Sequence, residues 1–322
     1  MKAPRRDGGS SSASHRKVTS GFGSTDIQRM YKRRAISGWM TTAMHFSQRD
    51  ALRIGDILSQ AAVTEIMPRF QKLAADQVRQ KSSSFDLVTE ADEAAERVIT
   101  NQLRAAFPDC IIVGEEATAK DPTLLAGIAE AELAFIVDPI DGTKNFVSGL
   151  PLFGVMLAAT VRGEVVLSAI HEPVREDTAF ALRGEGAWIQ SKDGSTVSLR
   201  VAEPAPLSGM EAMVSTSYLP EPLRTVVNGN LSRIGMVSSL RCAAHEYRMV
   251  ASGHCHILLY NKLMPWDHAA GWLLHREAGG YSAHFDGSGY RPAHFSGGLI
   301  CAPDRASWQL ARDALLGDAQ TP

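Results

Sequence analysis

The feature that most constrains this chain is an apolar run that leads directly into two aspartates. Residues 133–137 (LAFIV) are typical of a buried β-strand, and Asp138 and Asp141 follow them in the sequence DPIDGT. A second short apolar run, residues 110–113, leads within two positions into Glu115. Because strand ends open onto the crevices in which α/β proteins place ligands, we expect these carboxylates to line a binding cleft.

The composition of DPIDGT indicates what kind of ligand such a cleft would take. Carboxylates brought together with no basic residue between them repel one another, and a hard cation such as Mg²⁺, which also binds water and substrate phosphate, relieves this repulsion. Pro139 stiffens the turn, and Gly142 permits a ligand to approach the backbone closely. A helical turn beginning near Thr143 would present free N–H groups to a phosphate. The segment therefore predicts phosphoryl chemistry.

Each of these motifs has a simpler explanation when it is taken alone. DPIDGT is also typical of an ordinary Asp/Pro/Gly turn with a capping aspartate. Glu115 and Glu116 would equally suit a solvated acidic corner, and Asp267 would suit the N-cap of a helix over residues 268–278. Asp92 is accounted for by the dipole of the helix in whose first turn it is predicted to lie. The presence of all of them in one chain is what favours a common site.

The order of the predicted elements divides the chain into three parts. Residues 1–45 are rich in Ser, Gly, Arg and Lys and show neither helical nor strand periodicity, which predicts a disordered basic extension. Residues 46–198 combine helices with strand hairpins, which predicts an α+β subdomain with an antiparallel sheet and the metal-binding motifs. Strands and helices alternate over residues 199–322, which predicts an α/β subdomain that completes the active site.

Charge and cysteine content limit the expected partners and location. The formal net charge of the whole chain is −2, so nucleic acid is not an expected partner, although residues 1–50 hold ten basic and three acidic residues. The basic extension would alternatively serve as an organelle transit peptide or a weak nucleic-acid arm. No stretch is typical of a membrane span, and the four cysteines are scattered without a CxxC pair. We therefore expect a cytoplasmic protein with no membrane partner.

Four motifs occur in a fixed order along the organised part of the chain. They are KSSSFDLVTEAD at residues 81–92, GEE at 114–116, DPIDGTKNF at 138–146 and WDHAAG at 266–271. The set resembles the inositol monophosphatase family, within the lithium-sensitive, Mg²⁺-dependent phosphatase superfamily, over residues 47–316. The resemblance implies a layered αβαβα sandwich, a homodimer, and hydrolysis of a small phosphate monoester.

The resemblance also implies a role for each matching residue. The ligands of two Mg²⁺ ions, with a weaker third ion shared by Glu115, would be Glu115, Asp138, Asp141, Asp267 and the carbonyl of Ile140. The Thr143 hydroxyl, supported by Asp92, would orient and activate the attacking water, and the amides of Gly142 and Thr143 would hold the phosphate. Lys81 would lie on a mobile loop over the site. The residues implied to contact the substrate are Glu115, Ile140, Asp141, Gly142, Thr143, Arg241, Tyr260 and Asp267.

The alcohol half of the substrate is where the chain departs from the family. Inositol-preferring members carry Gly-Ser/Thr-Ala-Ala before a helix, whereas this chain has Arg241 followed by Cys-Ala-Ala. Their acidic residues on the strand before the Trp-Asp motif are replaced here by His256 and Tyr260. Loss of these carboxylates should weaken binding of inositol hydroxyls. Arg241 would favour an additional anionic group, or it is a structural residue at a helix start.

These observations lead to one expected function and two alternatives. We expect a Mg²⁺-dependent phosphomonoesterase that uses a metal-activated water, with inositol 1-phosphate as the first substrate to test. Histidinol phosphate is the enzymatic alternative, because DGTKNFVSGLPLFG at residues 141–154 also resembles the histidinol-phosphate phosphatase branch. Nucleotide 3′-phosphates and fructose bisphosphate have less support. The alternative from another class is binding to RNA or to the transcription machinery, as some bacterial family members do.

Overall fold

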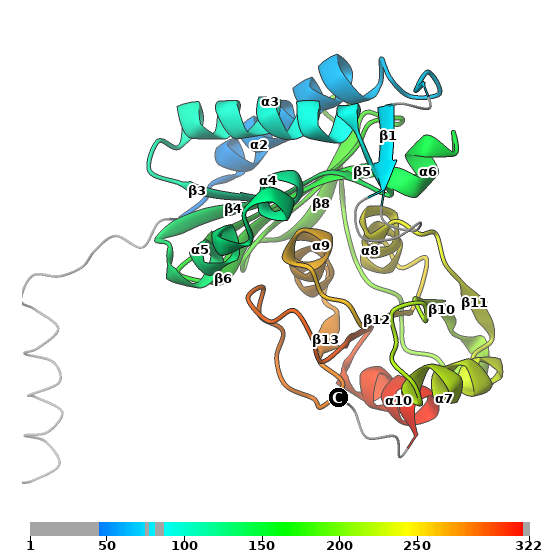
Figure 1. The fold of residues 1–322 in the computed structure, drawn as a ribbon. Coiled ribbons are helices and arrows are strands. Elements are labelled where there is room, and N and C mark those ends of the chain that lie inside the picture. Colours follow the sequence, from blue (N-terminus) through cyan, green and yellow to red (C-terminus); the bar gives the residue numbers. More distant parts are fainter. Residues whose placement is uncertain (1–44, 75–76, 81–86, 318–322) are drawn as a thin grey trace, which may run out of the picture. The chain divides into compact units, whose positions relative to one another are not determined.

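The structure is a computed structural model that describes residues 45–74, 77–80 and 87–317 (Figure 1). The expectations for the basic extension before residue 45 and for Lys81 lie outside these residues. The first motif is described from Leu87 onward, and the other three motifs lie wholly within the described residues. No helix among the described residues is long and apolar enough to cross a membrane.

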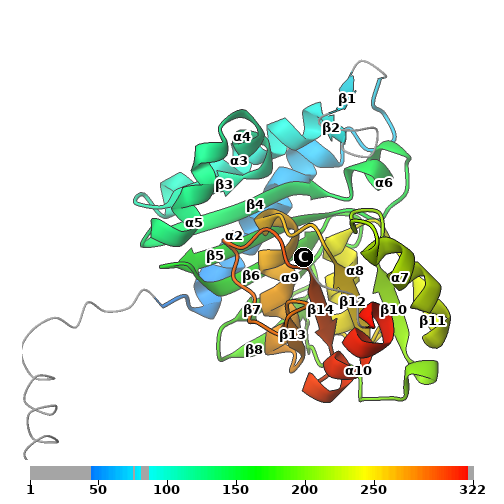
Figure 2. The same ribbon diagram turned by 60° about the horizontal axis from the view of Figure 1, so that its bottom comes forward.

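The described chain forms five alternating layers of helix and sheet. Helices α2 (Gln48–Ala61) and α3 (Glu90–Ala106) pack on one face of a seven-stranded sheet, and α8 (Ala243–Ala251) and α9 (Pro265–Glu277) pack on its other face. A five-stranded sheet follows, and α7 (Leu223–Asn230) and α10 (Arg305–Leu316) cover its outer face (Figures 1 and 2). The predicted αβαβα sandwich is thus confirmed.

The seven-stranded sheet has the order β3-β4-β5-β6-β7-β8-β9. Its strands are β3 (Ile111–Gly114), β4 (Leu133–Asp141), β5 (Gly154–Val161), β6 (Glu164–Glu172), β7 (Asp177–Leu182), β8 (Gly186–Gln190) and β9 (Thr196–Ser198). Every neighbouring pair is antiparallel except β3 and β4, which are parallel. Because β3 and β4 are parallel, their carboxyl ends lie at the same edge of the sheet. The short helix α4 (Glu115–Lys120) begins where β3 ends, at this edge.

The five-stranded sheet has the order β11-β10-β12-β14-β13. Its strands are β10 (Glu211–Val214), β11 (Met236–Ser238), β12 (Ile257–Tyr260), β13 (Tyr281–Ala283) and β14 (Leu299–Ala302). Strands β11, β10 and β12 are parallel, whereas β14 is antiparallel to both of its neighbours. The carboxyl ends of the three parallel strands therefore share one edge, where ligands bind in open α/β sheets.

Strict alternation along the strands explains why each sheet has two apolar faces. In β5, Val155 and Leu157 enter the core beneath α2 and α3, whereas Met156 and Ala158 enter the central core with α8 and α9. Because side chains of successive strand residues point to opposite faces, a sheet covered on both sides must be apolar at nearly every position.

Two local predictions need correction. Helix α9 begins at Pro265 and not after Asp267, so Asp267 lies in its first turn and is not its N-cap. Pro suits this first position because its missing N–H would have no intrahelical partner. The turn expected from Pro139 also begins later, since β4 continues to Asp141 with an irregularity in its pairing with β5 between Asp138 and Asp141.

Candidate metal and phosphate site

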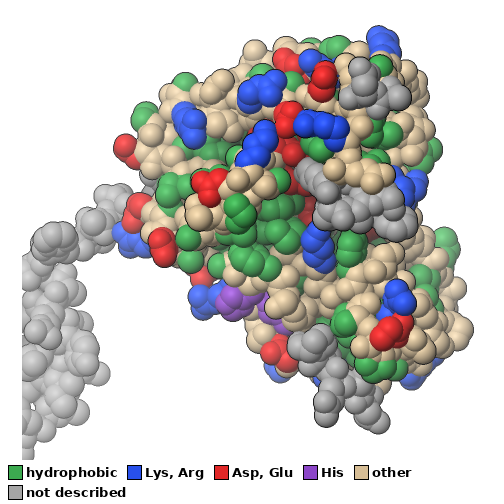
Figure 3. Space-filling model, viewed as in Figure 1, with side chains coloured by type: hydrophobic (Ala, Val, Ile, Leu, Met, Phe, Trp, Pro, Cys, Tyr) green, Lys and Arg blue, Asp and Glu red, His purple; other side chains and the backbone are tan. Residues whose placement is uncertain are grey.

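Three aspartates from two distant parts of the chain meet at the end of β4. Asp138 and Asp141 are contributed by β4, and Asp267 by the first turn of α9. One carboxylate oxygen of each lies within 4.8 Å of the others. In the space-filling view, acidic side chains occupy a recess in the middle of the displayed face, with basic side chains on either side of it (Figure 3).

Burial and mutual repulsion raise the pKa values of these carboxylates. Burial, followed by the charges of Glu115, Asp141 and Asp267, raises the pKa of Asp138 well above its ordinary value. Burial, followed by Glu115 and Asp141, also raises the pKa of Asp267, while the Lys262 ammonium opposes that rise. The charge of Glu115 therefore acts on both aspartates, which places it beside the cluster.

Asp141 differs because hydrogen-bond donors partly stabilise its charge. Burial raises its pKa to about 6, whereas donors from Cys242 and from the start of α8 oppose the rise. The Ala244 N–H donates to Oδ2 at 2.6 Å, and the Cys242 thiol donates to the same oxygen at 2.9 Å. Asp141 is thus held at the positive end of α8, where a carboxylate is favoured.

The cluster fits a hard divalent cation. Its ligands are carboxylate oxygens, which Mg²⁺ prefers, and their raised pKa values reflect burial first and then the mutual repulsion that a cation would remove. The Ile140 carbonyl, which the sequence also nominated, accepts a hydrogen bond from the Thr143 hydroxyl at 2.9 Å. Within the described residues, Asp138, Asp141 and Asp267 are the acidic group close enough to share an ion.

The Thr143 hydroxyl lies between two acceptors. Its oxygen is 2.9 Å from the Ile140 carbonyl and 3.3 Å from Oδ1 of Asp92, which belongs to α3. The other oxygen of Asp92 accepts from the N–H and the hydroxyl of Thr89 at 2.9 and 2.5 Å, completing the predicted capping box. Asp92 therefore starts α3 and also reaches Thr143, 51 positions further along the chain.

Gly142 joins β4 to the short helix α6 (Thr143–Val147) in a conformation that favours glycine. Its φ is +85°, and a Cβ atom there would lie 2.9 Å from the Leu152 carbonyl and 3.1 Å from Cβ of Cys242. The chain thus turns sharply where the sequence predicted a phosphate cradle. The side chain of Asn145 holds this turn by donating to the carbonyls of Leu152 and Leu240, both at 2.8 Å.

A buried glutamate that the sequence analysis missed fixes Glu115 and Glu116. Glu96 of α3 accepts from the N–H groups of Glu116 and Ala117 at 2.7 and 2.8 Å, so it caps α4. Any Cβ on Gly114 would fall within 2.6 Å of the Glu96 carboxylate. The helical register offered a signal, because Glu96 follows Asp92 by four positions and shares its face of α3.

Tyr260 and Arg241, the residues nominated for the alcohol half of the substrate, differ in exposure, and a second buried glutamate binds the Tyr260 hydroxyl. The Tyr260 hydroxyl donates to Glu246 of α8, which also accepts from the Leu240 N–H at 2.8 Å and the Ser239 hydroxyl at 3.4 Å. Tyr260 is buried, whereas the Arg241 side chain is exposed. The sequence does not predict Glu246 as a site residue, because no local sequence pattern links a residue of α8 to a tyrosine on the later strand β12.

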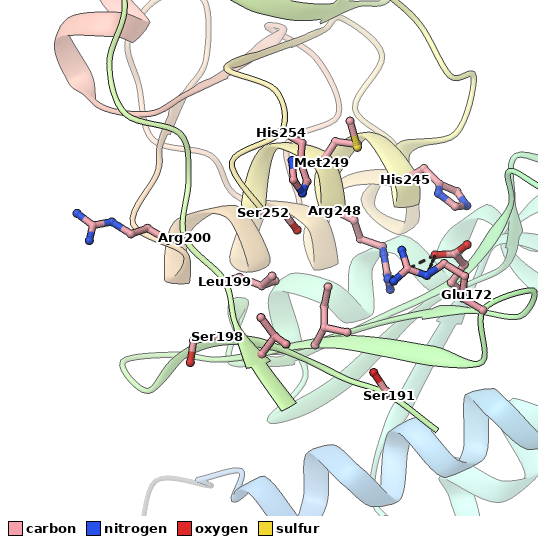
Figure 4. A pocket seen from close by; sticks show the side chains of 13 residues that line it. Glu172, Ser191, Ser198, Leu199, Arg200, His245, Arg248, Met249, Ser252 and His254 are labelled. Carbon is pink, nitrogen blue, oxygen red and sulfur yellow. Dashed lines mark ion pairs between the residues drawn. The ribbon is translucent and has the colours of Figure 1, made fainter. Parts of the chain in front are cut away.

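A separate cavity of about 350 Å³ lies beside α8 (Figure 4). None of the nominated site residues lines it. On its wall, Arg248 forms buried ion pairs with Asp177 at 2.5 Å and Glu172 at 3.4 Å. These contacts fix α8 to β6 and β7, and hence fix the helix start that contacts Asp141.

The fold and the site together define a layered α/β protein with a carboxylate-rich candidate metal centre. The chain belongs to the inositol monophosphatase family, whose model matches residues 49–319. It is 35% identical over 213 residues to the fructose-1,6-bisphosphatase/inositol-1-monophosphatase of Thermotoga maritima, covering 66% of this chain and 77% of that one.

A second relative and a solved structure extend this comparison. The Nus factor SuhB of Pseudomonas aeruginosa is 33% identical, with 69% of this chain and 81% of that protein covered. A solved structure of the Thermotoga maritima IMPase matches with a TM-score of 0.69 at 29% identity, covering 83% of this chain and 98% of that one. Family membership supports a phosphatase, and these relatives carry the names of a phosphatase and of a Nus factor.

Proposed function

We propose that this protein is a Mg²⁺-dependent phosphomonoesterase that hydrolyses a small alcohol phosphate with a water nucleophile. The observation that carries the proposal is the meeting of Asp138, Asp141 and Asp267 beside the Thr143–Asp92 pair. Carboxylates in such a cluster suit Mg²⁺, and a hydroxyl held against a carboxylate suits the handling of a water proton. Family membership supports the same conclusion.

Each described residue has a distinct task in this proposal. Asp138, Asp141, Asp267, Glu115 and the Ile140 carbonyl would hold two Mg²⁺ ions, with a weaker third. The bound ions would supply Lewis-acid stabilisation of the phosphoryl oxygens and lower the pKa of water. Thr143 would accept a hydrogen bond from the attacking water and pass its own proton toward Asp92. The amides at Gly142 and Thr143 would orient the phosphate, because a helix start leaves its first N–H groups without intrahelical partners.

The substrate is proposed at the level of a phosphate monoester, with inositol 1-phosphate as the reference compound. Histidinol phosphate is the alternative from the sequence, and fructose 1,6-bisphosphate is suggested by the name of the Thermotoga maritima relative. We also infer from the family resemblance that the protein is a homodimer in the cytoplasm. The four unpaired cysteines are compatible with a reducing compartment.

The test is phosphate release from these esters with Mg²⁺ and with EDTA. The proposal requires turnover that EDTA abolishes and that Asp138→Asn lowers by at least about a thousandfold, because an amide cannot provide the anionic ligand. Arg200→Gln is a matched control, since the Arg200 side chain is 83% exposed and lies at the rim of the separate cavity. Turnover that survives EDTA would contradict the metal-dependent mechanism.

A second candidate function is contact with the transcription machinery. It is favoured by the relatives named Nus factor SuhB, and by the basic charge of residues 1–50. Deleting residues 1–43 separates the two roles. If phosphatase activity persists while RNA or polymerase no longer co-purifies, the extension carries a binding function of its own. If both properties persist, the extension is an appendage.

A further inference from the structure

Strand β9 forms an open edge of the seven-stranded sheet. It is the last strand in the sheet order, and its one partner among the described strands is β8. All of its residues are exposed. Sheet edges are usually protected by charged residues, proline or a bulge, because their free N–H and C=O groups can pair with another chain. The sequence of β9, Thr-Val-Ser, contains no charged residue or proline, and its pairing with β8 contains no bulge.

The register of β9 shows which backbone groups face outward. The Leu199 N–H donates to the Ala187 carbonyl at 2.8 Å, which makes these two residues a hydrogen-bonded pair. Such pairs recur at every second position of an antiparallel ladder, so Val197 also directs its N–H and C=O at β8. Its neighbours Thr196 and Ser198 therefore direct theirs away from the sheet. Among the described residues, no hydrogen bond occupies these outward groups.

The cavity of about 350 Å³ beside α8 adjoins one face of this edge. We call it the α8-side cavity, and its apolar lining is formed by Ile189, Val197, Leu199 and Met249 (Figure 4). The Val197 side chain is 63% exposed, so an apolar side chain placed beside it would bury surface on both partners. The buried charges on the wall, Arg248 and Glu172, already pair with each other. The α8-side cavity therefore favours an apolar side chain.

A second cavity, of about 370 Å³, adjoins the other face of the edge. We call it the α2-side cavity, because residues of α2, β8 and β9 line it. Its charged lining residues are Glu185 and Glu277, and no described Lys or Arg lines it. Glu277 uses Oε2 to accept from two N–H groups of the turn between β7 and β8, and Glu185 lies 3.4 Å from the exposed His45 ring. The α2-side cavity therefore favours a basic side chain.

The two cavities fit the alternation of side chains along a strand. Successive side chains of a strand point to opposite faces of its sheet. A strand added to β9 would direct the residue opposite Val197 into the α8-side cavity, and the residues on either side of it into the α2-side cavity. The matching sequence is basic–apolar–basic, which reads the same in both directions and so fits a parallel or an antiparallel strand.

We propose that β9 binds an extended peptide of a partner protein as an additional strand, and that this peptide carries the pattern basic–apolar–basic. The outward N–H and C=O groups of Thr196 and Ser198 would supply main-chain affinity, and the two cavities would supply specificity, as in other cases of strand addition. The inference is independent of the proposed phosphomonoesterase function, because neither cavity contains a residue of the candidate metal and phosphate site.

The test is binding of a fluorescein-labelled peptide to the full-length protein, measured by fluorescence anisotropy. The probe is a seven-residue peptide with the core Lys-Leu-Lys and flanking Thr and Ser. We expect a Kd below about 100 μM. A peptide with the core Lys-Lys-Leu has the same composition and charge but breaks the alternation, so it should bind at least about tenfold more weakly. A peptide with the core Glu-Leu-Glu should also bind at least about tenfold more weakly, because both glutamates would face Glu185 and Glu277.

Protein variants connect the binding to β9. Thr196→Pro removes an outward N–H at the first residue of an edge strand, where proline is tolerated, so Kd should rise about tenfold with little change in Tm. Val197→Asp places a charge beside the apolar side chain of the peptide and should raise Kd by about tenfold as well. Val174→Asp is the matched control, because Val174 is an exposed apolar residue that lines neither cavity.

An acidic-residue variant tests the α2-side cavity separately. Glu185→Gln should lower the preference for Lys-Leu-Lys over Thr-Leu-Thr by at least about threefold, because the amide does not attract the ammonium. Glu132→Gln is the matched control, since the Glu132 side chain is 57% exposed and lines neither cavity. An equal loss of preference in both variants would show that the attraction comes from overall charge and would overturn the assignment of this cavity.

Several results would overturn the inference as a whole. They are no binding of Lys-Leu-Lys up to about 1 mM, equal binding of the Lys-Lys-Leu peptide, and an unchanged Kd in both Thr196→Pro and Val197→Asp. Two further results would identify a different occupant of the edge. A dimer that Thr196→Pro dissociates in sedimentation velocity would assign the edge to a second copy of this chain. Peptide binding that becomes at least about tenfold tighter on deletion of residues 1–43 would assign it to the chain's own extension.

Discussion

The Asp141 carboxylate accepts a 2.6 Å hydrogen bond from the backbone N–H of Ala244, 103 positions later in the chain. Asp141 belongs to β4, and Ala244 to the first turn of α8. One carboxylate oxygen is thus used to position a helix of the central layer, while the residue also belongs to the three-aspartate cluster. The packing of α8 on the seven-stranded sheet and the geometry of the candidate metal site are therefore coupled through Asp141.

This coupling predicts how Mg²⁺ stabilisation depends on pH. In the metal-free protein burial raises the pKa of Asp141 to about 6, and the pKa values of Asp138 and Asp267 are raised as well. The native state then binds protons more tightly than the unfolded state, so metal-free stability should fall as pH rises from about 4 through 6. Mg²⁺ requires the ionised carboxylates, so its stabilising effect should grow over the same interval.

The measurement is the rise in Tm on adding Mg²⁺ at pH 5 and at pH 8. We expect a small rise at pH 5 and a rise several degrees larger at pH 8. Asp267→Asn is the control, because it removes one ligand and should reduce the effect at both pH values. Equal rises at pH 5 and pH 8 in the unaltered protein would contradict the assignment of the cluster as the Mg²⁺ site.

The Cys242 thiol is predicted to keep the pKa of Asp141 lower than burial alone would, and so to affect activity at acid pH. Its thiol donates to Asp141 at 2.9 Å, and this bond opposes the rise in the pKa of Asp141 that burial causes. Cys242→Val removes the donor while keeping a side chain of similar size, so the pKa of Asp141 should rise further. The acid limb of kcat/KM should then move to higher pH. Cys242→Ser keeps a donor and should leave the acid limb in place. A shift of this limb in Cys242→Ser as large as that in Cys242→Val would argue against the hydrogen bond as its cause.

The sequence predicted some parts of the fold and the site but not others, depending on how far apart in the chain the interacting residues lie. The strand over residues 133–137, the capping box of Thr89 and Asp92, and the carboxylates of DPIDGT are local patterns, and the structure contains them. Helix α9 begins three positions before the predicted start at His268, and Pro265 is the local signal for that start. The link between Tyr260 and Glu246 joins different elements, so no local pattern reveals it.

Thr143 is predicted to act on the chemical step and not on folding. Its hydroxyl lies 3.3 Å from Asp92 and 2.9 Å from the Ile140 carbonyl, beside the carboxylate cluster. Thr143→Val keeps the shape of the side chain and removes the hydroxyl, so kcat should fall by about 10² to 10⁴ while Tm changes little. Thr143→Ser keeps the hydroxyl and should retain most of the activity. A large fall in kcat for Thr143→Ser, together with an unchanged kcat for Thr143→Val, would refute the role of the hydroxyl.

Arg248 is predicted to be important for stability. Its side chain is 7% exposed and pairs with Asp177 and Glu172, which are 4% and 7% exposed. Arg248→Met leaves the two carboxylates with only the exposed Arg175, among the described residues, as a cationic partner, which should lower the free energy of unfolding by about 1–3 kcal/mol. Urea denaturation measures this loss. Arg200→Met at the exposed rim of the same cavity is the control and should cost less than about 0.5 kcal/mol, and a similar loss in both variants would refute the buried-pair explanation.

Gly142 is predicted to tolerate no side chain, for two separate reasons. Its φ of +85° is costly for other residues, by about 1–2 kcal/mol, and a Cβ would come within 2.9 Å of the Leu152 carbonyl and 3.2 Å of the Cys242 sulfur. Gly142→Ala should therefore destabilise the protein and also displace the start of α6 from Asp141. Gly184→Ala is a matched control, because its φ is +81° and nothing lies within 4 Å of the added Cβ. Both variants should lose similar backbone stability, but Gly142→Ala alone should lower kcat/KM, by at least about tenfold. If Gly184→Ala lowers kcat/KM equally, the loss arises from general destabilisation and not from the geometry of the phosphate cradle.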